Sequence, residues 1–238
     1  TPAATYAHSN DRGKWGEIFP QAFSPRFGDG VDVLIGAGRR QIGEQLVAAG
    51  SSYEALSQAH RPIYSGLEQV PDSSTRPVVV ADEVDVHAAV LRALDLLQQS
   101  PNGYVLVVEW DVHTNEPLEG LQGLVDFDRL IAEVESRVDL DDTLLLFTGD
   151  HSFGIQVDGG SPGDDVLEGY DAWKASDSDE PIVRLENLLV NDSHTGEEVP
   201  ALAIGAGAER VRGYFPNTYL FHVMLEALGW QADGGPSR

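Results

Sequence analysis

The chain has 238 residues, of which 39 are Asp or Glu and 15 are Lys or Arg, so its formal net charge is -24. This length corresponds to one large domain, or one and a half, and the acidic balance argues against a nucleic-acid or anionic-lipid surface, because both need clustered Lys and Arg. The lack of cysteine excludes thiolate catalysis, disulfides and thiolate metal sites, so any transition-metal site must use nitrogen and oxygen ligands. No apolar run reaches the roughly 18 to 20 residues of a membrane span.

Strands and helices alternate along the sequence. Four apolar runs rich in β-branched residues predict buried strands at Val31–Ile35, Tyr104–Val108, Thr143–Phe147 and Val199–Ile204. Amphipathic patterns predict helices at Gln41–Ala49, Val84–Gln99, Leu118–Val138 and Thr218–Leu228. The alternation predicts an α/β fold with a largely parallel sheet and helices on both faces, whose sites lie at the carboxyl ends of the strands. The glycine-containing segment 158–180 has eight acidic residues and one lysine, and it predicts an exposed loop or insertion.

Carboxylates and imidazoles follow two of these strands. Glu109, Asp111 and His113 come after the second strand at a spacing of two, which in an extended backbone places all three side chains on one side. Two carboxylates and an imidazole together favour a divalent metal ion, because clustered carboxylates without a cation raise a pKa and lower stability. The alternative is that the carboxylates cap the next helix and that His113 is a polar loop residue.

A second pair, Asp150 and His151, directly follows the third strand and can reach one cation from a turn. The alternative is a helix-capping aspartate beside a surface histidine. His194 lies shortly before the fourth strand, either as a surface residue or as a further ligand.

Several strings resemble the alkaline phosphatase family. Thr148-Gly149-Asp150-His151 is similar to the family's T-A-D-H segment, and the string from His194 to Pro200 is similar to its H-T-G-x-x-V-P segment. The stretch from Gly205 to Gly213, followed by Asn217-Thr218, resembles the loop before the last helix and the start of that helix. The resemblance implies that Asp150 and His151 bind one zinc ion and that His194 binds the other.

The first residues extend this resemblance. Thr1-Pro2-Ala3-Ala4 is similar to the family's A-T-P-A-A segment, which implies that Thr1 is a magnesium ligand. Arg12, eleven residues later, matches the arginine that holds the substrate phosphate through a bidentate fork. Glu109 matches the glutamate that binds magnesium, and Asp111 and His113 match a zinc-binding pair. The spacing between these three residues is shorter here than in the family.

The resemblance also implies a function. It implies an alkaline-phosphatase-like fold and hydrolysis of phosphate monoesters by a two-zinc plus magnesium mechanism through a phosphoserine. Family members are usually exported, to the periplasm or the extracellular space, and are often homodimers. The family's nucleophilic serine lies upstream of the segment that matches Thr1. We therefore expect residues 1–238 to be the carboxyl-terminal part of a single domain, incomplete at the N-terminus and inactive alone.

Two alternatives remain at the level of the sequence. The same fold and metal core resemble those of sulfatases and phosphodiesterases. A related metal-dependent phosphodiesterase or sulfatase is therefore one alternative. The other is a catalytically inert metal-binding fragment, because the covalent step needs a nucleophile.

Overall fold

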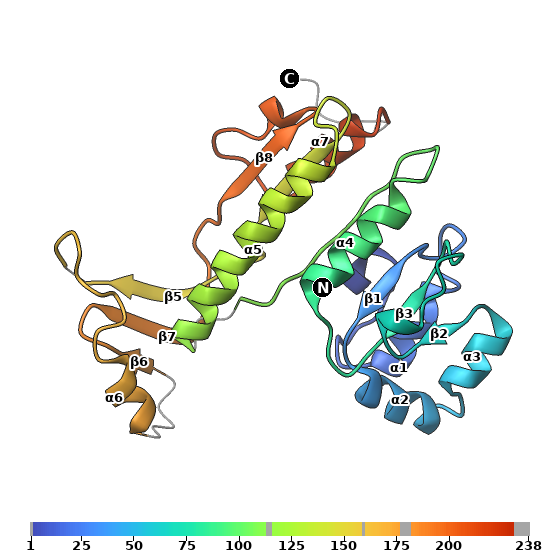
Figure 1. Ribbon diagram of the computed structural model, residues 1–238, viewed down its shortest axis with the longest axis horizontal. Helices are drawn as coiled ribbons and strands as arrows, with labels where there is room; N and C mark the ends of the chain where they lie inside the picture. Colours follow the sequence, from blue (N-terminus) through green and yellow to red (C-terminus); the bar gives the residue numbers. More distant parts are fainter. Residues whose placement is uncertain (1, 113–115, 159, 177–181, 231–238) are drawn as a thin grey trace. The chain divides into compact units, whose positions relative to one another are not determined.

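The computed structural model describes residues 2–112, 116–158, 160–176 and 182–230, and the chain divides into two compact units, Thr1–Trp110 and Asp111–Arg238 (Figure 1). Each unit has its own helices and strands. Among the described residues, no helix combines the length and the apolar character needed to cross a membrane.

The first unit is built on a parallel sheet. Its elements in chain order, with η for a 3-10 helix, are η1 (Pro2–Thr5), α1 (Trp15–Ile18), η2 (Phe19–Ala22), β1 (Leu34–Gly36), α2 (Arg39–Ala48), α3 (Tyr53–Ala59), β2 (Ile63–Tyr64), η3 (Leu67–Gln69), β3 (Val78–Val80) and α4 (Val86–Leu97). The strand order is β1-β3-β2, and both neighbouring pairs are parallel. A parallel sheet combined with helices confirms the predicted α/β class.

Alternation along β3 places apolar side chains on both faces of this sheet. Val78 and Val80 pack in one cluster with Phe19, Phe23 and Leu46, which come from η2, the following residue and α2. Val79 points to the opposite face and is only 1% exposed, so that face is covered as well. A strand buried on both faces is the usual arrangement in a parallel sheet.

The second unit is antiparallel. Its elements are α5 (Pro117–Arg137), β4 (Leu144–Thr148), β5 (Ser152–Val157), α6 (Tyr170–Ala175), β6 (Ile182–Arg184), β7 (Leu188–Thr195), β8 (Ala201–Gly205), η4 (Ala208–Arg210) and α7 (Tyr219–Ala227). β4 pairs with β8, while β7 lies between β5 and β6. Helix α5 packs on β4 through an edge-to-face contact between Phe127 and Phe147, whose ring centres are 5.9 Å apart.

The predicted helices are all present, with ends shifted by at most two residues, as α2, α4, α5 and α7. Three of the four predicted strands are present as β1, β4 and β8, although β1 begins only at Leu34. The prediction of a buried strand at Tyr104–Val108 was wrong. This segment is not assigned to a strand, and Val105 and Val107 are 58% and 49% exposed. An apolar run becomes a strand only where a neighbour pairs with it, which the run itself does not specify.

The acidic segment 158–180 contains a short helix, α6, within the predicted loop or insertion. The Tyr170 hydroxyl donates a hydrogen bond to the Glu116 carboxylate, and Lys174 Nζ lies 3.3 Å from Glu116 Oε2. Trp173 packs against the buried cluster of Val183, Leu188 and Val190. The hydrogen bond to Glu116 is the main reason that the pKa of Tyr170 is raised to about 12. Helix α6 is therefore tethered to the start of α5.

Candidate functional site

Asp150 and His151 lie at the break between two successive antiparallel ladders, β4–β8 and β5–β7. Strands β4 and β8 pair from Leu144↔Gly205 to Thr148↔Ala201, and pairing resumes between β5 and β7 at Ser152↔Thr195. Between these stretches, residues 149–151 face residues 196–200, so that three residues oppose five. Asp150 and His151 lie on the short side of this break.

A second irregularity lies two pairs further along. Phe153 pairs with His194, but the next residue, Gly154, pairs with Asn191, so β7 has two extra residues at this point. A Cβ atom at Gly154 would lie 3.1 Å from the Asn191 Cβ, which is a close approach that favours glycine. Bulges bend a strand and redirect its side chains. Only two residue pairs therefore separate the break from the bulge, and His194 belongs to one of them.

The pleat of this short stretch brings two histidines together. His151 and Phe153 are two residues apart and project to the same face, while His194 is directly opposite Phe153 on the neighbouring strand. The His151 and His194 rings are stacked, with centres 4.0 Å apart and planes 26° apart. The structure therefore brings together two imidazoles that are 43 positions apart in the sequence.

Asp150 adds a carboxylate to the His151 side of this pair. Its Oδ2 lies 3.5 Å from His151 Nε2, and its Oδ1 accepts a hydrogen bond of 3.1 Å from the His151 backbone N–H. The side chain of Asp150 is 85% exposed and that of His151 is 31% exposed. Both groups are therefore open to a ligand from solution.

The donor atoms of Asp150 and His151 fit a borderline cation such as zinc. Two ligand atoms on a tetrahedral zinc ion, each at about 2.0–2.1 Å, lie roughly 3.3 Å apart, close to the 3.5 Å between Oδ2 and Nε2. His151 Nδ1 lies 3.3 Å from the Ser152 carbonyl oxygen. When Nδ1 carries the proton it donates to that oxygen and leaves the Nε2 lone pair free, which is the usual arrangement of a metal-binding histidine.

The opposite face of the same ladder pairs is polar. Ser152 and Thr195 oppose each other there, and Glu197 follows within the longer side of the break. Hydrogen bonding, from the Thr195 side chain above all, holds the pKa of the Glu197 carboxyl below its usual range. This face therefore presents a carboxylate near two hydroxyl groups.

Arg12 lies in an exposed turn of the first unit that is braced on both sides. Asp11 Oδ1 accepts a hydrogen bond of 2.8 Å from the Gly13 N–H, and Ser9 Oγ donates one of 2.8 Å to the Asp11 carbonyl oxygen. The side-chain amide of Gln45, on α2, donates to the Gly13 carbonyl oxygen at 2.9 Å. The backbone of the turn is thus fixed, while the Arg12 guanidinium makes no hydrogen bond or ion pair with the residues that the structure describes.

Of the four remaining predicted metal ligands, the structure describes Glu109 and Asp111. Thr1 and His113 lie outside the described residues. Glu109 is exposed near the end of the first unit, and Asp111 is exposed as the first residue of the second. Within the described ranges, no group of three or more His, Asp or Glu side chains is arranged to hold one metal ion. The structure therefore assembles a carboxylate–imidazole pair and a stacked second imidazole.

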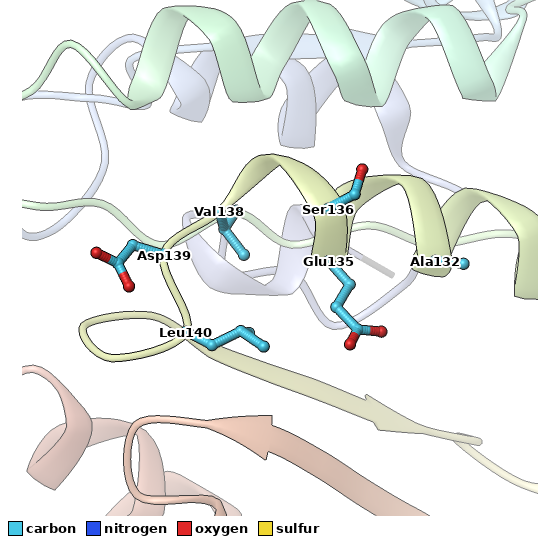
Figure 2. A pocket seen from close by; sticks show the side chains of 6 residues that line it. All are labelled: Ala132, Glu135, Ser136, Val138, Asp139 and Leu140. Atoms are coloured by element: carbon cyan, nitrogen blue, oxygen red, sulfur yellow. The ribbon is translucent and has the colours of Figure 1, made fainter.

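A separate hollow of the second unit lies at the carboxyl end of α5. It has a volume of about 500 Å³ and is lined by Ala132, Glu135, Ser136, Val138, Asp139 and Leu140. Figure 2 shows that the Glu135 and Asp139 carboxylates point in different directions. The hollow brings no imidazole or basic group to these acids, so its lining does not resemble a catalytic site.

The sequence analysis did not single out Phe153, whose ring contacts both imidazoles. Its centre lies 5.2 Å from that of His151 and 5.3 Å from that of His194. The sequence signal for Phe153 is its position two residues after a strand-end histidine, because a spacing of two places both side chains on one face of a strand. Its contact with His194 depends on the register between β5 and β7, which neither strand reveals alone.

Comparisons with known proteins agree with the resemblance seen in the sequence. The family model described as alkaline phosphatase matches residues 82–187, which include Glu109, Asp111, His113, Asp150 and His151. Alkaline phosphatase 4 of Bacillus subtilis (strain 168) is 23% identical, over 79% of this chain and 54% of its own length. The human tissue-nonspecific isozyme is 21% identical over 95% of this chain and 60% of its own length. Streptomycin-6-phosphate phosphatase of Streptomyces griseus is 27% identical over 96% and 66%.

Solved structures show the same fold. The alkaline phosphatase of the Antarctic bacterium TAB5 aligns with a TM-score of 0.71 at 21% identity, covering 98% of this chain and 69% of that one. A mutant of the TAB5 enzyme with Mg bound in its M3 site aligns with a TM-score of 0.73 at 20% identity. The chain thus has the alkaline phosphatase fold, and it spans 54% to 66% of the length of the three relatives named above.

Proposed function

Since this chain is related to the alkaline phosphatases along most of its length, we propose that the protein is a phosphate-monoester hydrolase of that type. The observation that carries the proposal is the cluster of Asp150, His151 and His194 at the break in the ladder. The sequence resemblance assigns all three of these residues to the binding of zinc ions. The fold therefore assembles side chains that share a predicted chemical role and that are distant in the sequence.

The stacking of the imidazoles supports two cations rather than one. A ring nitrogen binds a metal ion through a lone pair that lies in the plane of the ring. Two rings whose planes differ by only 26° direct these lone pairs along nearly parallel planes, so they suit separate ions side by side. Metal ions in two-metal hydrolases are about 3.5–4 Å apart, and the ring centres are 4.0 Å apart.

We assign the metal ligands as follows. Asp150 and His151 bind one zinc ion, His194 binds the second together with Asp111 and His113, and Glu109 binds magnesium with Thr1. When bound, these ions supply positive charge that lowers the pKa of an attacking hydroxyl group or water and stabilises the leaving oxygen. The hydrogen bond available to His151 Nδ1 fixes the tautomer that presents Nε2.

Arg12 binds the phosphate group of the substrate in this proposal. A guanidinium group donates two parallel hydrogen bonds to two oxygens of a phosphate, which fixes the orientation of the phosphate as well as holding it. The braced turn from Asp11 to Gly13 limits the backbone motion of Arg12 and thereby lowers the entropic cost of holding the phosphate.

The metal content of the full-length protein tests the ligand assignment. We expect about two zinc ions and one magnesium ion per chain, and about one zinc ion fewer in His194→Ala. His60→Ala is the matched control, because His60 is also a stacked imidazole, with its ring centre 4.9 Å from that of Phe23, but it belongs to the first unit. An equal metal content in wild type and His194→Ala contradicts the assignment.

Hydrolysis of three p-nitrophenyl compounds by the full-length protein tests the reaction. A monoesterase prefers p-nitrophenyl phosphate to the bis-p-nitrophenyl phosphate diester and to p-nitrophenyl sulfate. A preference for the diester or the sulfate instead supports the related phosphodiesterase or sulfatase. Metal binding without hydrolysis of any of the three supports an inert metal-binding protein.

We also propose that the protein is exported, to the periplasm or the extracellular space, and that it forms a homodimer. The family resemblance supports both proposals. Cell fractionation and sedimentation of the full-length protein test them. A cytoplasmic monomer is the result that contradicts both.

A further inference from the structure

Phe153 contacts both histidines of the candidate site. Its ring stands at 70° to the His151 ring and at 84° to the His194 ring, so both contacts are edge-to-face. We infer that Phe153 is a positioning residue that holds the two zinc-binding imidazoles in their stacked arrangement. This inference rests on the proposed function, because it assigns the imidazoles to two metal ions.

The backbone explains why one side chain can serve both rings. Phe153 shares a strand face with His151 at a spacing of two residues, and it is the direct cross-strand partner of His194. The two histidines are therefore both neighbours of Phe153 on a single face. No other position of β5 has this relation to both, since the next pair, Gly154↔Asn191, lies beyond the bulge.

The His194 ring depends on its aromatic neighbours for its orientation. His194 is exposed, and its ring makes no hydrogen bond or ion pair with the described part of the chain. Its contacts are the stack with His151 and the edge-to-face contact with Phe153. His151, in contrast, also has the Ser152 carbonyl oxygen and the Asp150 carboxylate within 3.5 Å. Loss of the Phe153 ring should therefore affect His194 more than His151.

Groups that orient metal ligands without touching the metal typically change metal affinity by about 10- to 100-fold when they are removed. An aromatic ring restricts a neighbouring imidazole through packing and through the attraction between a ring edge and a ring face. We therefore expect Phe153→Leu to weaken zinc binding about 10-fold, mainly at the site that uses His194.

The experiment measures zinc affinity of the full-length protein by competition with a chromophoric chelator, together with the melting temperature of the metal-free protein. Phe147→Leu is the matched control. Phe147 is half-buried like Phe153 and makes an edge-to-face contact, at 5.9 Å with Phe127, on the same unit of the chain. Phe153→Leu should weaken zinc binding while Phe147→Leu should leave it unchanged, and Phe153→Tyr, which keeps the ring, should bind zinc like the wild type.

Three results overturn the inference. The first is wild-type zinc affinity in Phe153→Leu, and the second is an equal loss of affinity in Phe147→Leu. If Phe153→Leu does not fold, Phe153→Met, which keeps the volume but lacks the ring, takes its place with the same expectation. The third is a wild-type protein that binds no zinc, which refutes the proposed function and this inference together. The first result, found with a wild type that binds zinc and hydrolyses p-nitrophenyl phosphate, refutes the inference but not the proposed function.

Discussion

Gly205 is the last residue of β8, the strand that pairs with β4, and replacing Gly205 with alanine should disrupt that pairing. Gly205 has φ +94°, and a Cβ atom there would lie 2.0 Å from the Thr143 carbonyl oxygen. The positive φ alone costs about 1–2 kcal/mol for a residue with a Cβ atom. The contact adds about 1–3 kcal/mol, as overpacking usually does. Rotation of a side chain cannot relieve it, because the obstructing atom belongs to the backbone.

The same carbonyl oxygen accepts a hydrogen bond of 3.0 Å from the Ala206 N–H. Any movement that relieves the contact therefore weakens this bond and the adjacent pair Leu144↔Gly205. We expect Gly205→Ala to lower the free energy of unfolding by about 2–5 kcal/mol in total.

Gly207→Ala is the control that separates the two effects. Gly207 also has a positive φ, +81°, but a Cβ atom there would meet nothing within 4 Å. It should cost only about 1–2 kcal/mol. Urea unfolding followed by far-UV circular dichroism measures both variants, and hydrogen exchange of β4 and β8 locates the loss. Equal destabilisation of the two variants would falsify the steric argument.

Three further changes probe the first unit through urea unfolding. Leu46 is only 1% exposed, so Leu46→Ala should lower the free energy of unfolding by about 2–5 kcal/mol; a loss below that range contradicts its place in the core. Ser52 caps α3 by accepting a hydrogen bond of 3.1 Å from the Ala55 N–H, and Ser52→Ala should cost about 1 kcal/mol, whereas no change means that the cap is dispensable. Burial is the main reason that the pKa of Tyr53 is raised to about 12, so its contribution to stability is present below about pH 10 and is lost as the pH rises towards 12. Tyr53→Phe should make stability less dependent on pH in that window, and an unchanged dependence refutes the assignment.

The four longer helices, α2, α4, α5 and α7, were predicted from the sequence because their signal is local, whereas the shorter α1, α3 and α6 were not predicted. The apolar periodicity and an N-cap lie within one segment, as in α4, where the Asp85 side chain accepts a hydrogen bond of 3.1 Å from the Ala88 N–H. The short strands were not predicted, although Val78–Val80 is an apolar run directly after a proline. A strand of three residues carries too little pattern to be separated from a buried loop.

The sequence named Asp150, His151 and His194 as candidates but did not give the geometry in which they meet. Asp150 and His151 were identified because they follow a strong strand, and His194 because of the string that contains it. The stack between His151 and His194 depends on the register of β5 against β7, and that register shifts by two residues at the bulge beside Gly154. Register is a property of two strands together with the turn and bulge between them, so one strand's sequence does not specify it.

The break between the two ladders explains how antiparallel strands can bring a carboxylate and two imidazoles together. In an unbroken ladder, the residues opposite one another are held at fixed spacings, and their backbone groups bond to each other. The break frees residues 149–151 from this pairing, so Asp150 Oδ1 can accept the His151 N–H and Oδ2 can lie near Nε2. The paired stretches on either side then fix where the break lies. A disturbance at Gly205, the far end of the β4–β8 pairing, should therefore reach Asp150 and His151 through the backbone, whereas one at Gly207, beyond the paired residues, should not.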